Sequence, residues 1–100
     1  MAKNIYKTKR WLRLREYVLR RDGYMCQESK RYGRVVPANM VHHIYPAKDY
    51  PELFFNPDNL ISLSNVEHNH MHDRLTDEIT AKGRVWQKKV EGKLFGKNNI

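Results

Sequence analysis

The chain has 100 residues, of which 40% are hydrophobic and 11% aromatic, and this suffices for one domain with a modest core. No apolar run reaches the roughly 18 residues that a membrane-spanning helix needs, and the first residues lack the apolar segment of a signal peptide. The formal net charge is +8, and a single cysteine, Cys26, excludes both an internal disulfide and a four-cysteine zinc site. We therefore expect a soluble, intracellular protein.

The first predicted element is a helix that begins after Thr8, a good N-cap, and runs to about Arg21. It ends at an Asp-Gly pair. One of its faces is an apolar stripe at helical spacing, which predicts contact with the core; it consists of Trp11, Leu14, Val18 and Leu19. A second face carries Arg10, Arg13, Tyr17 and Arg20 and is either a phosphate-contacting stripe or a solvated one.

Further strands and two more helices are predicted after it. Residues 24–38 suggest a small strand or irregular hairpin around Gly33, and residues 39–45 a clearer strand that Pro46 closes. A loop of about fourteen residues, punctuated by proline and asparagine, leads to a second strand at 60–63. The sequence Ser64-x-x-Glu67 is a capping box, which predicts a helix to about Ala81, ended by Gly83. Residues 84–91 suggest a short terminal helix.

The charge is unevenly distributed along these elements. Residues 1–34 carry eleven basic and three acidic side chains, residues 35–82 three basic and seven acidic, and residues 83–100 five basic and one acidic. Basic ends of this kind suit a polyanion, because each neutralised phosphate releases counterions. The alternative is that basic surface serves solubility alone.

All five histidines lie in the middle segment, between residues 42 and 72. His42 and His43 are adjacent on a predicted strand, so their side chains point to opposite faces. His68 and His72 are four apart on a predicted helix and share a face, which is a familiar metal-chelating spacing. Each pair alone is compatible with surface histidines, and Asn59 alone with turn chemistry. Together, in the order strand, loop, strand, helix, they indicate a three-histidine metal site with an open coordination position.

These residues resemble the motif of the HNH endonuclease family. The matching pieces between Val41 and Leu75 are Val41-His42-His43-Ile44-x-Pro46, Pro51-Glu52-Leu53, Asn56-Pro57-Asp58-Asn59-Leu60 and Glu67-His68-Asn69. The segments from Trp11 to Asp22 and Cys26-Gln27 are similar to the lead-in helix and knuckle of phage-type members. The resemblance implies an α+β fold with a small ββα-metal core, a β-hairpin plus a helix that cradle one metal ion. It also implies one HNH domain over residues 1–100, with the core motif at about 38–82, a basic N-terminal helix at about 8–21 and a short helical, basic C-terminal extension at 83–100.

The same resemblance implies roles for single residues. His43 matches the histidine that acts as general base on the attacking water, and Asn59 matches the central asparagine, which orients that histidine in some relatives and touches the metal in others. His68 matches a metal ligand. His42 stands where many relatives have a metal-binding aspartate, and with His72 the pattern is similar to the DNase domains of bacterial colicins. The implied ligands are thus His42, His68 and His72.

Two features of the sequence bear on which metal ions the chain binds. Many phage-type relatives hold a structural zinc with two Cys-x-x-Cys pairs, but here the matching positions are Cys26, Ser29, Ser64 and Glu67, so we expect no such zinc and a buried, unreactive Cys26. Imidazole ligands favour zinc, nickel, cobalt or manganese over magnesium, and the identity of the single divalent ion stays open. His70 is expected at the surface, and Asp73 is expected to be a solvated carboxylate rather than a partner of a ligand imidazole.

The sequence therefore predicts a metal-dependent endonuclease that hydrolyses phosphodiester bonds of double-stranded DNA. The expected DNA-binding side chains are Arg10, Arg13, Arg20, Lys88 and Lys89. Phage-type relatives imply an origin in a phage, work in the host cytoplasm and a link to terminase in genome packaging, as a monomer or homodimer. The alternatives are a decayed HNH-like DNA-binding module whose metal is structural, and a toxin-like nuclease that needs an immunity partner.

Overall fold

The computed structural model describes residues 4–73, 75, 76 and 78–96. Its long helices are α1 (Lys9–Arg21) and α4 (Ala81–Phe95), and its short ones are α2 (Gln27–Arg31) and α3 (Asn65–Asn69). The strands are β1 (Met40–His43) and β2 (Leu60–Leu63), and single 3-10 turns cover Ile5–Lys7, Pro51–Leu53 and Pro57–Asn59. Among the described residues no helix is both long enough and apolar enough to cross a membrane.

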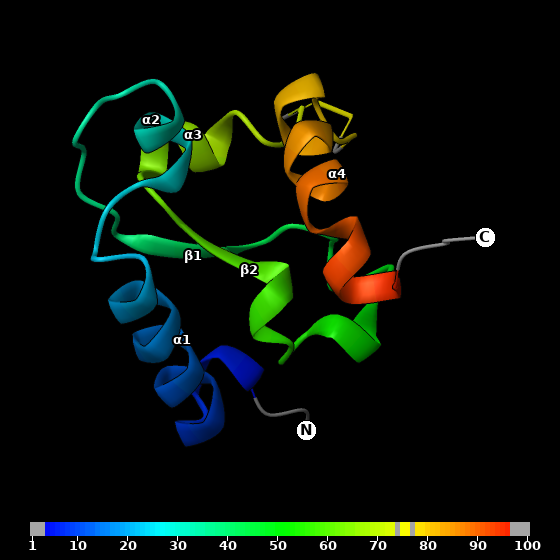
Figure 1. The fold of residues 1–100 in the computed structure, drawn as a ribbon. Coiled ribbons are helices and arrows are strands. Elements are labelled where there is room, and N and C mark those ends of the chain that lie inside the picture. The colour runs from blue at the N-terminus through cyan, green and yellow to red at the C-terminus, as the bar shows by residue number, and fades with distance from the viewer. Residues whose placement is uncertain (1–3, 74, 77, 97–100) are drawn as a thin grey trace.

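The centre of the fold is a two-stranded antiparallel sheet in which His42 faces Ile61 and His43 faces Leu60. Figure 1 shows α1 on one side of this hairpin, α2 and α3 on the other, and α4 beside it. All four residues of β2 are buried, because the strand is covered on both faces. The fold is the α+β arrangement that was predicted, a hairpin followed by a short helix.

The first helix matches its prediction. Thr8 caps it by accepting a hydrogen bond from the backbone N–H of Trp11 at 3.3 Å. Trp11, Val18 and Leu19 are buried. Trp11 and Val18 join Leu60 in one of two apolar clusters, and partly buried Leu14 packs against it. The predicted stripe therefore anchors α1 to one face of the hairpin.

The prediction of a strand or hairpin for residues 24–38 was wrong. Only an isolated bridge between Met25 and Pro37 pairs the ends of this segment, and the helix α2 lies between them. Its Glu28 is fully buried and accepts hydrogen bonds from Trp86 Nε1 at 2.7 Å and from Arg31 at 2.8 Å. Contacts with a residue 58 positions away override the weak local preference for strand.

The predicted long helix from Ser64 to Ala81 is also wrong in its extent. Ser64 does cap α3, but this helix ends at Asn69. The Asp73 carboxylate accepts hydrogen bonds from the backbone N–H groups of Leu75 and Thr76, and Thr76 Oγ1 accepts one from Glu78. Such side-chain bonds offer the backbone an alternative to the helix.

Gly83 does not end a helix, as had been predicted, but lies within the first turn of α4, which extends from residue 81 to residue 95 rather than from 84 to 91. A Cβ atom at this position would lie 2.7 Å from the carbonyl oxygen of Met71 and 2.9 Å from Ile79 Cγ2. The glycine therefore lets α4 pack closely against Met71 and Ile79. Residues 97–100 of the predicted basic tail lie outside the described residues.

Of the four positions Cys26, Ser29, Ser64 and Glu67, which match the cysteines of the resemblance, only the first carries a thiol. Cys26 is fully buried, as predicted, and burial raises the pKa of its thiol, but hydrogen bonds with Ser29 and Ser64 outweigh this and lower it. Glu67 pairs with Lys82 Nζ at 2.9 Å, and the same ammonium lies 3.8 Å from Glu28. Hydrogen bonds and ion pairs thus connect α2, α3 and α4.

Candidate functional site

A cavity of about 430 Å³ lies along β1, and every residue of that strand lines it. The other lining residues come from the N-terminal segment, α1, the turn after β1 and the chain around α3; they are Tyr6, Trp11, Arg15, Pro46, His68 and His72. In the described part of the chain β1 pairs with β2 alone, so its other edge is open. This open edge explains how His42 and His43, which point to opposite faces of the hairpin, reach one cavity.

Three of the four lining histidines form a cluster on one side of β1. The ring centroid of His42 lies 5.1 Å from that of His68 and 5.6 Å from that of His72. The interpretation of His68 and His72 as a helical pair is wrong, because His72 lies beyond α3, in an isolated bridge with Ile79. The turn that ends the helix nevertheless brings His72 to the same cavity.

The residue types of this cluster fit a divalent ion. Imidazole rings whose nitrogens lie about 2 Å from one tetrahedral ion have centroids about 5 Å apart, close to the separations seen here. Burial, helped by the neighbouring imidazoles, lowers the pKa of His42 to about 3, and burial likewise lowers that of His68. Both rings are therefore neutral at physiological pH, which is the form that binds metals. Within the described residues, however, no group of three or more His, Cys, Asp or Glu side chains is arranged to hold an ion.

His43 lies on the other side of β1, among aromatic rings. Its ring stacks on Trp11 with centroids 5.3 Å apart and lies 4.5 Å from that of Phe54. Its Nε2 is 3.1 Å from the carbonyl oxygen of Phe54. Because a carbonyl can only accept, Nε2–H donates, and Nδ1 is the nitrogen with a free lone pair in the neutral ring. Burial lowers the pKa of His43, although this hydrogen bond opposes the shift.

Asn59 is fully buried and lies behind the cavity rather than in its lining. Its Oδ1 accepts a hydrogen bond from the backbone N–H of Tyr45 at 2.8 Å, and its Nδ2 donates to the carbonyl oxygens of Tyr45 at 3.1 Å and Leu53 at 3.4 Å. The amide thus joins the two ends of the loop after β1. Since Phe54 follows Leu53 directly, Asn59 fixes the segment whose carbonyl accepts from His43.

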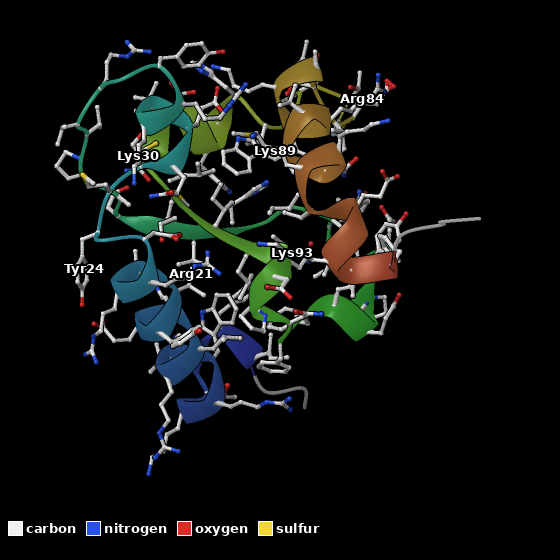
Figure 2. The ribbon with its side chains drawn as sticks, viewed as in Figure 1. Arg21, Tyr24, Lys30, Arg84, Lys89 and Lys93 are labelled. Atoms are coloured by element: carbon white, nitrogen blue, oxygen red, sulfur yellow. The ribbon has the colours of Figure 1, made fainter. Side chains whose placement is uncertain are left out.

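The predicted DNA-binding side chains lie outside the cavity lining. The guanidinium of Arg10 lies 3.7 Å over the ring of Phe55, and Arg20 is 3.6 Å from Glu16 on the exposed face of α1, where Arg13 also lies. Lys88 and Lys89 belong to α4, and Figure 2 shows Lys89 on that helix with Arg84 and Lys93. His70 is exposed and contacts Glu67, and Asp73 is exposed, both as predicted.

The aromatic residues beside His43 were not predicted as parts of the site. Trp11 was predicted to lie in the core, and no role was predicted for Tyr6 or Phe54. In the structure the ring centroid of Tyr6 lies 6.3 Å from that of His43 and 5.3 Å from that of Trp11. Arg15 was also missed. It lies in the segment from Trp11 to Asp22 that is similar to the lead-in helix of phage-type members, but no role was assigned to it.

The hairpin, the short helix after it and the histidines between them define a protein of the ββα-metal class. The structure is similar to the crystal structure of the HNH endonuclease of the deep-sea thermophilic bacteriophage GVE2 with manganese ion, with a TM-score of 0.63 and 34% sequence identity over 64% of this chain and 70% of that one. No family model matches the sequence, and no curated protein does. On the strength of this relative, the chain belongs to the HNH endonuclease family.

Proposed function

We propose that the protein is a metal-dependent endonuclease that hydrolyses phosphodiester bonds in DNA. The observation that carries this proposal is the convergence of His43 and the cluster of His42, His68 and His72 on one open cavity. The similarity to a phage endonuclease solved with manganese supports both the activity and a divalent ion, and the net charge of +8 suits a polyanionic substrate. We further propose that the gene is of phage origin.

His43 is the general base in this proposal. The Phe54 carbonyl holds its ring through Nε2–H, which leaves Nδ1 facing away from that bond and free to take a proton from an attacking water. Stacking on Trp11 fixes the plane of the ring. Asn59 is a positioning residue, because it holds the loop segment to which His43 donates.

His42, His68 and His72 would hold the ion. A divalent cation beside the scissile phosphate supplies charge stabilisation at phosphorus and at the leaving oxygen. The chain contributes three imidazoles, of which His42 and His68 are kept neutral by burial, and an open cavity beside them for the phosphate. Arg10, Arg13, Arg20, Lys88 and Lys89 would contact more distant phosphates.

The first test is cleavage of supercoiled plasmid by metal-stripped protein, with Mg²⁺, Mn²⁺, Co²⁺, Ni²⁺ and Zn²⁺ added separately. We expect nicking with at least one ion and a loss of about 10²–10⁴-fold in rate for His43→Ala, the usual contribution of a general base. The variant should still fold and should bind metal as the wild type does, with a lower unfolding temperature because the His43 ring packs on Trp11 and Phe54. Cleavage by neither protein with any ion, despite DNA and metal binding, would favour the decayed binding module.

The second test addresses the ligands separately from activity. His42→Ala, His68→Ala and His72→Ala should each weaken Mn²⁺ or Zn²⁺ binding, measured by calorimetry, at least about tenfold, since even groups that only support metal ligands cost 10–100-fold. His70→Ala is the matched control, because His70 is exposed and outside the cavity lining. Equal affinity of all four variants would exclude this ligand set.

A further inference from the structure

The cavity lining is nearly free of charge. It contains four histidines, two aromatic residues, three aliphatic ones and a single side chain that is cationic at every physiological pH, Arg15. None of the described lining residues is acidic. A cavity with one fixed positive charge and no carboxylate selects an anion.

Arg15 is held in place by its helix and by the hairpin. Its neighbour Leu14 and, one turn later, Val18 pack into the apolar cluster beneath α1, so this part of the helix is anchored to the core. Its Nη2 donates to the carbonyl oxygen of Asn39 at 3.3 Å, and the N–H of Asn39 in turn donates to Leu63 at 3.1 Å, at the end of the hairpin. A guanidinium carries five N–H donors in a planar fork, and this hydrogen bond uses one of them.

The other basic residues of α1 differ from Arg15 in their surroundings. Arg10 lies over the ring of Phe55, and Arg20 pairs with Glu16 on the exposed face. Neither belongs to the cavity lining, so they can reach only phosphates outside it. Among the basic residues that the structure describes, Arg15 alone combines a fixed charge, a backbone anchor and a place beside the histidines.

We infer that Arg15 binds a non-bridging oxygen of the scissile phosphate and stabilises the charge that develops there during hydrolysis. The inference rests on the proposed function and names the side chain that grips its substrate. A guanidinium suits this position because its parallel N–H groups match two oxygens of one phosphate, which an ammonium does not. Its effect is expected mainly in kcat, because the negative charge on those oxygens grows toward the transition state.

The experiment compares Arg15→Gln, Arg15→Lys and Arg34→Gln with the wild type at saturating Mn²⁺. Arg34 is exposed, lies in the segment after α2 and is outside the cavity lining, so Arg34→Gln removes the same charge elsewhere. The substrates are supercoiled plasmid and bis(p-nitrophenyl) phosphate, a small diester with a single phosphate. Mn²⁺ affinity by calorimetry and the unfolding temperature are measured on every variant.

We expect Arg15→Gln to lower kcat by about 10²-fold on both substrates, as the loss of one donor to a developing oxyanion does. Arg15→Lys should restore part of this lost kcat. Arg34→Gln should stay within about twofold of the wild-type kcat on the small diester, because that substrate has no further phosphate to contact. The Mn²⁺ affinity of all variants should equal that of the wild type.

Three results would overturn the inference. The first is an equal kcat for Arg15→Gln and Arg34→Gln. The second is a loss of kcat on plasmid alone, which would place Arg15 on a distant phosphate. The third is a loss of Mn²⁺ affinity or of folding that accounts for the lost activity. A wild-type protein that cleaves neither substrate would instead defeat the proposed function itself.

Discussion

At the scale of the residue, the position of Asn59 separates two roles that the family leaves open. The amide uses both of its polar atoms on the backbone of the loop after β1, and no part of it lines the cavity. An asparagine whose oxygen accepts from the N–H of Tyr45 is already committed to holding the loop. The arrangement therefore favours a role in positioning His43 over a contact with the metal.

We predict that Asn59→Ala lowers both stability and activity while metal affinity is retained. The change leaves the partly buried backbone N–H and C=O groups of Tyr45 without the Asn59 amide, which costs about 1–3 kcal/mol. In a domain of this size that is a fall of roughly 4–8 °C in Tm for each kcal/mol. Thermal unfolding, calorimetry with Mn²⁺ and plasmid cleavage would measure the three properties. A large loss of Mn²⁺ affinity in a folded variant would instead place Asn59 at the metal.

At the scale of the element, the sequence predicted α1, both strands and the loop between them, because each carries its own local signal. Thr8 and the apolar stripe mark the helix, and Pro46 and Asn59 bound the loop. The histidines of the cavity were singled out from their spacing, His42 next to His43 and His68 four residues before His72, and from the resemblance to the HNH motif.

The elements that were missed depend on contacts between distant parts of the chain. The helix α2 is stabilised by a buried Glu28 that binds Trp86 of α4, and no local pattern shows that pairing. The end of α3 at Asn69 depends on the burial of Met71, against which Gly83 of α4 packs, as well as on the local hydrogen bonds of Asp73 and Thr76. The i, i+4 spacing of His68 and His72 thus led to the right cavity through the wrong geometry.

Gly83 provides a test at this scale, since helix propensity and packing predict opposite effects for Gly83→Ala. Propensity alone would stabilise α4 by about 1 kcal/mol. The new Cβ would, however, meet the Met71 carbonyl, which is backbone, and forcing extra atoms into a packed site costs about 1–3 kcal/mol. We expect a lower Tm by calorimetric scanning, together with weaker Mn²⁺ binding because His72 follows Met71. A higher Tm would contradict the packing argument.

At the scale of the whole molecule, hydrogen bonds and ion pairs hold α2, α3 and α4 together. Cys26 forms hydrogen bonds with Ser29 and Ser64, and Lys82 lies between the carboxylates of Glu67 and Glu28. The packing of α2, α3 and α4 therefore depends on side chains that need no ion.

Because these hydrogen bonds and ion pairs need no ion, we predict that the protein stays folded when all metal is removed. After treatment with EDTA and a check of metal content, the far-ultraviolet circular dichroism should match that of the untreated protein. Adding back Mn²⁺ or Zn²⁺ should raise Tm only through binding to the folded state. At a metal concentration of 100 times the dissociation constant, this binding adds about 2.7 kcal/mol to the free energy of unfolding. Loss of helical signal on chelation would show that an ion holds the fold itself.

The cavity at the open edge of β1 forms only when distant segments of the chain have folded together. Its walls come from residues 6–15, residues 40–46 and residues 68–72, so segments from three widely separated parts of the chain must meet there. The last of these segments is braced by α4, through the close approach of Gly83 to Met71. A chain that emerges from the ribosome N-terminus first cannot close the cavity until most of its length is free to fold. A chain that stops before Gly83 therefore lacks a braced, complete histidine-lined pocket.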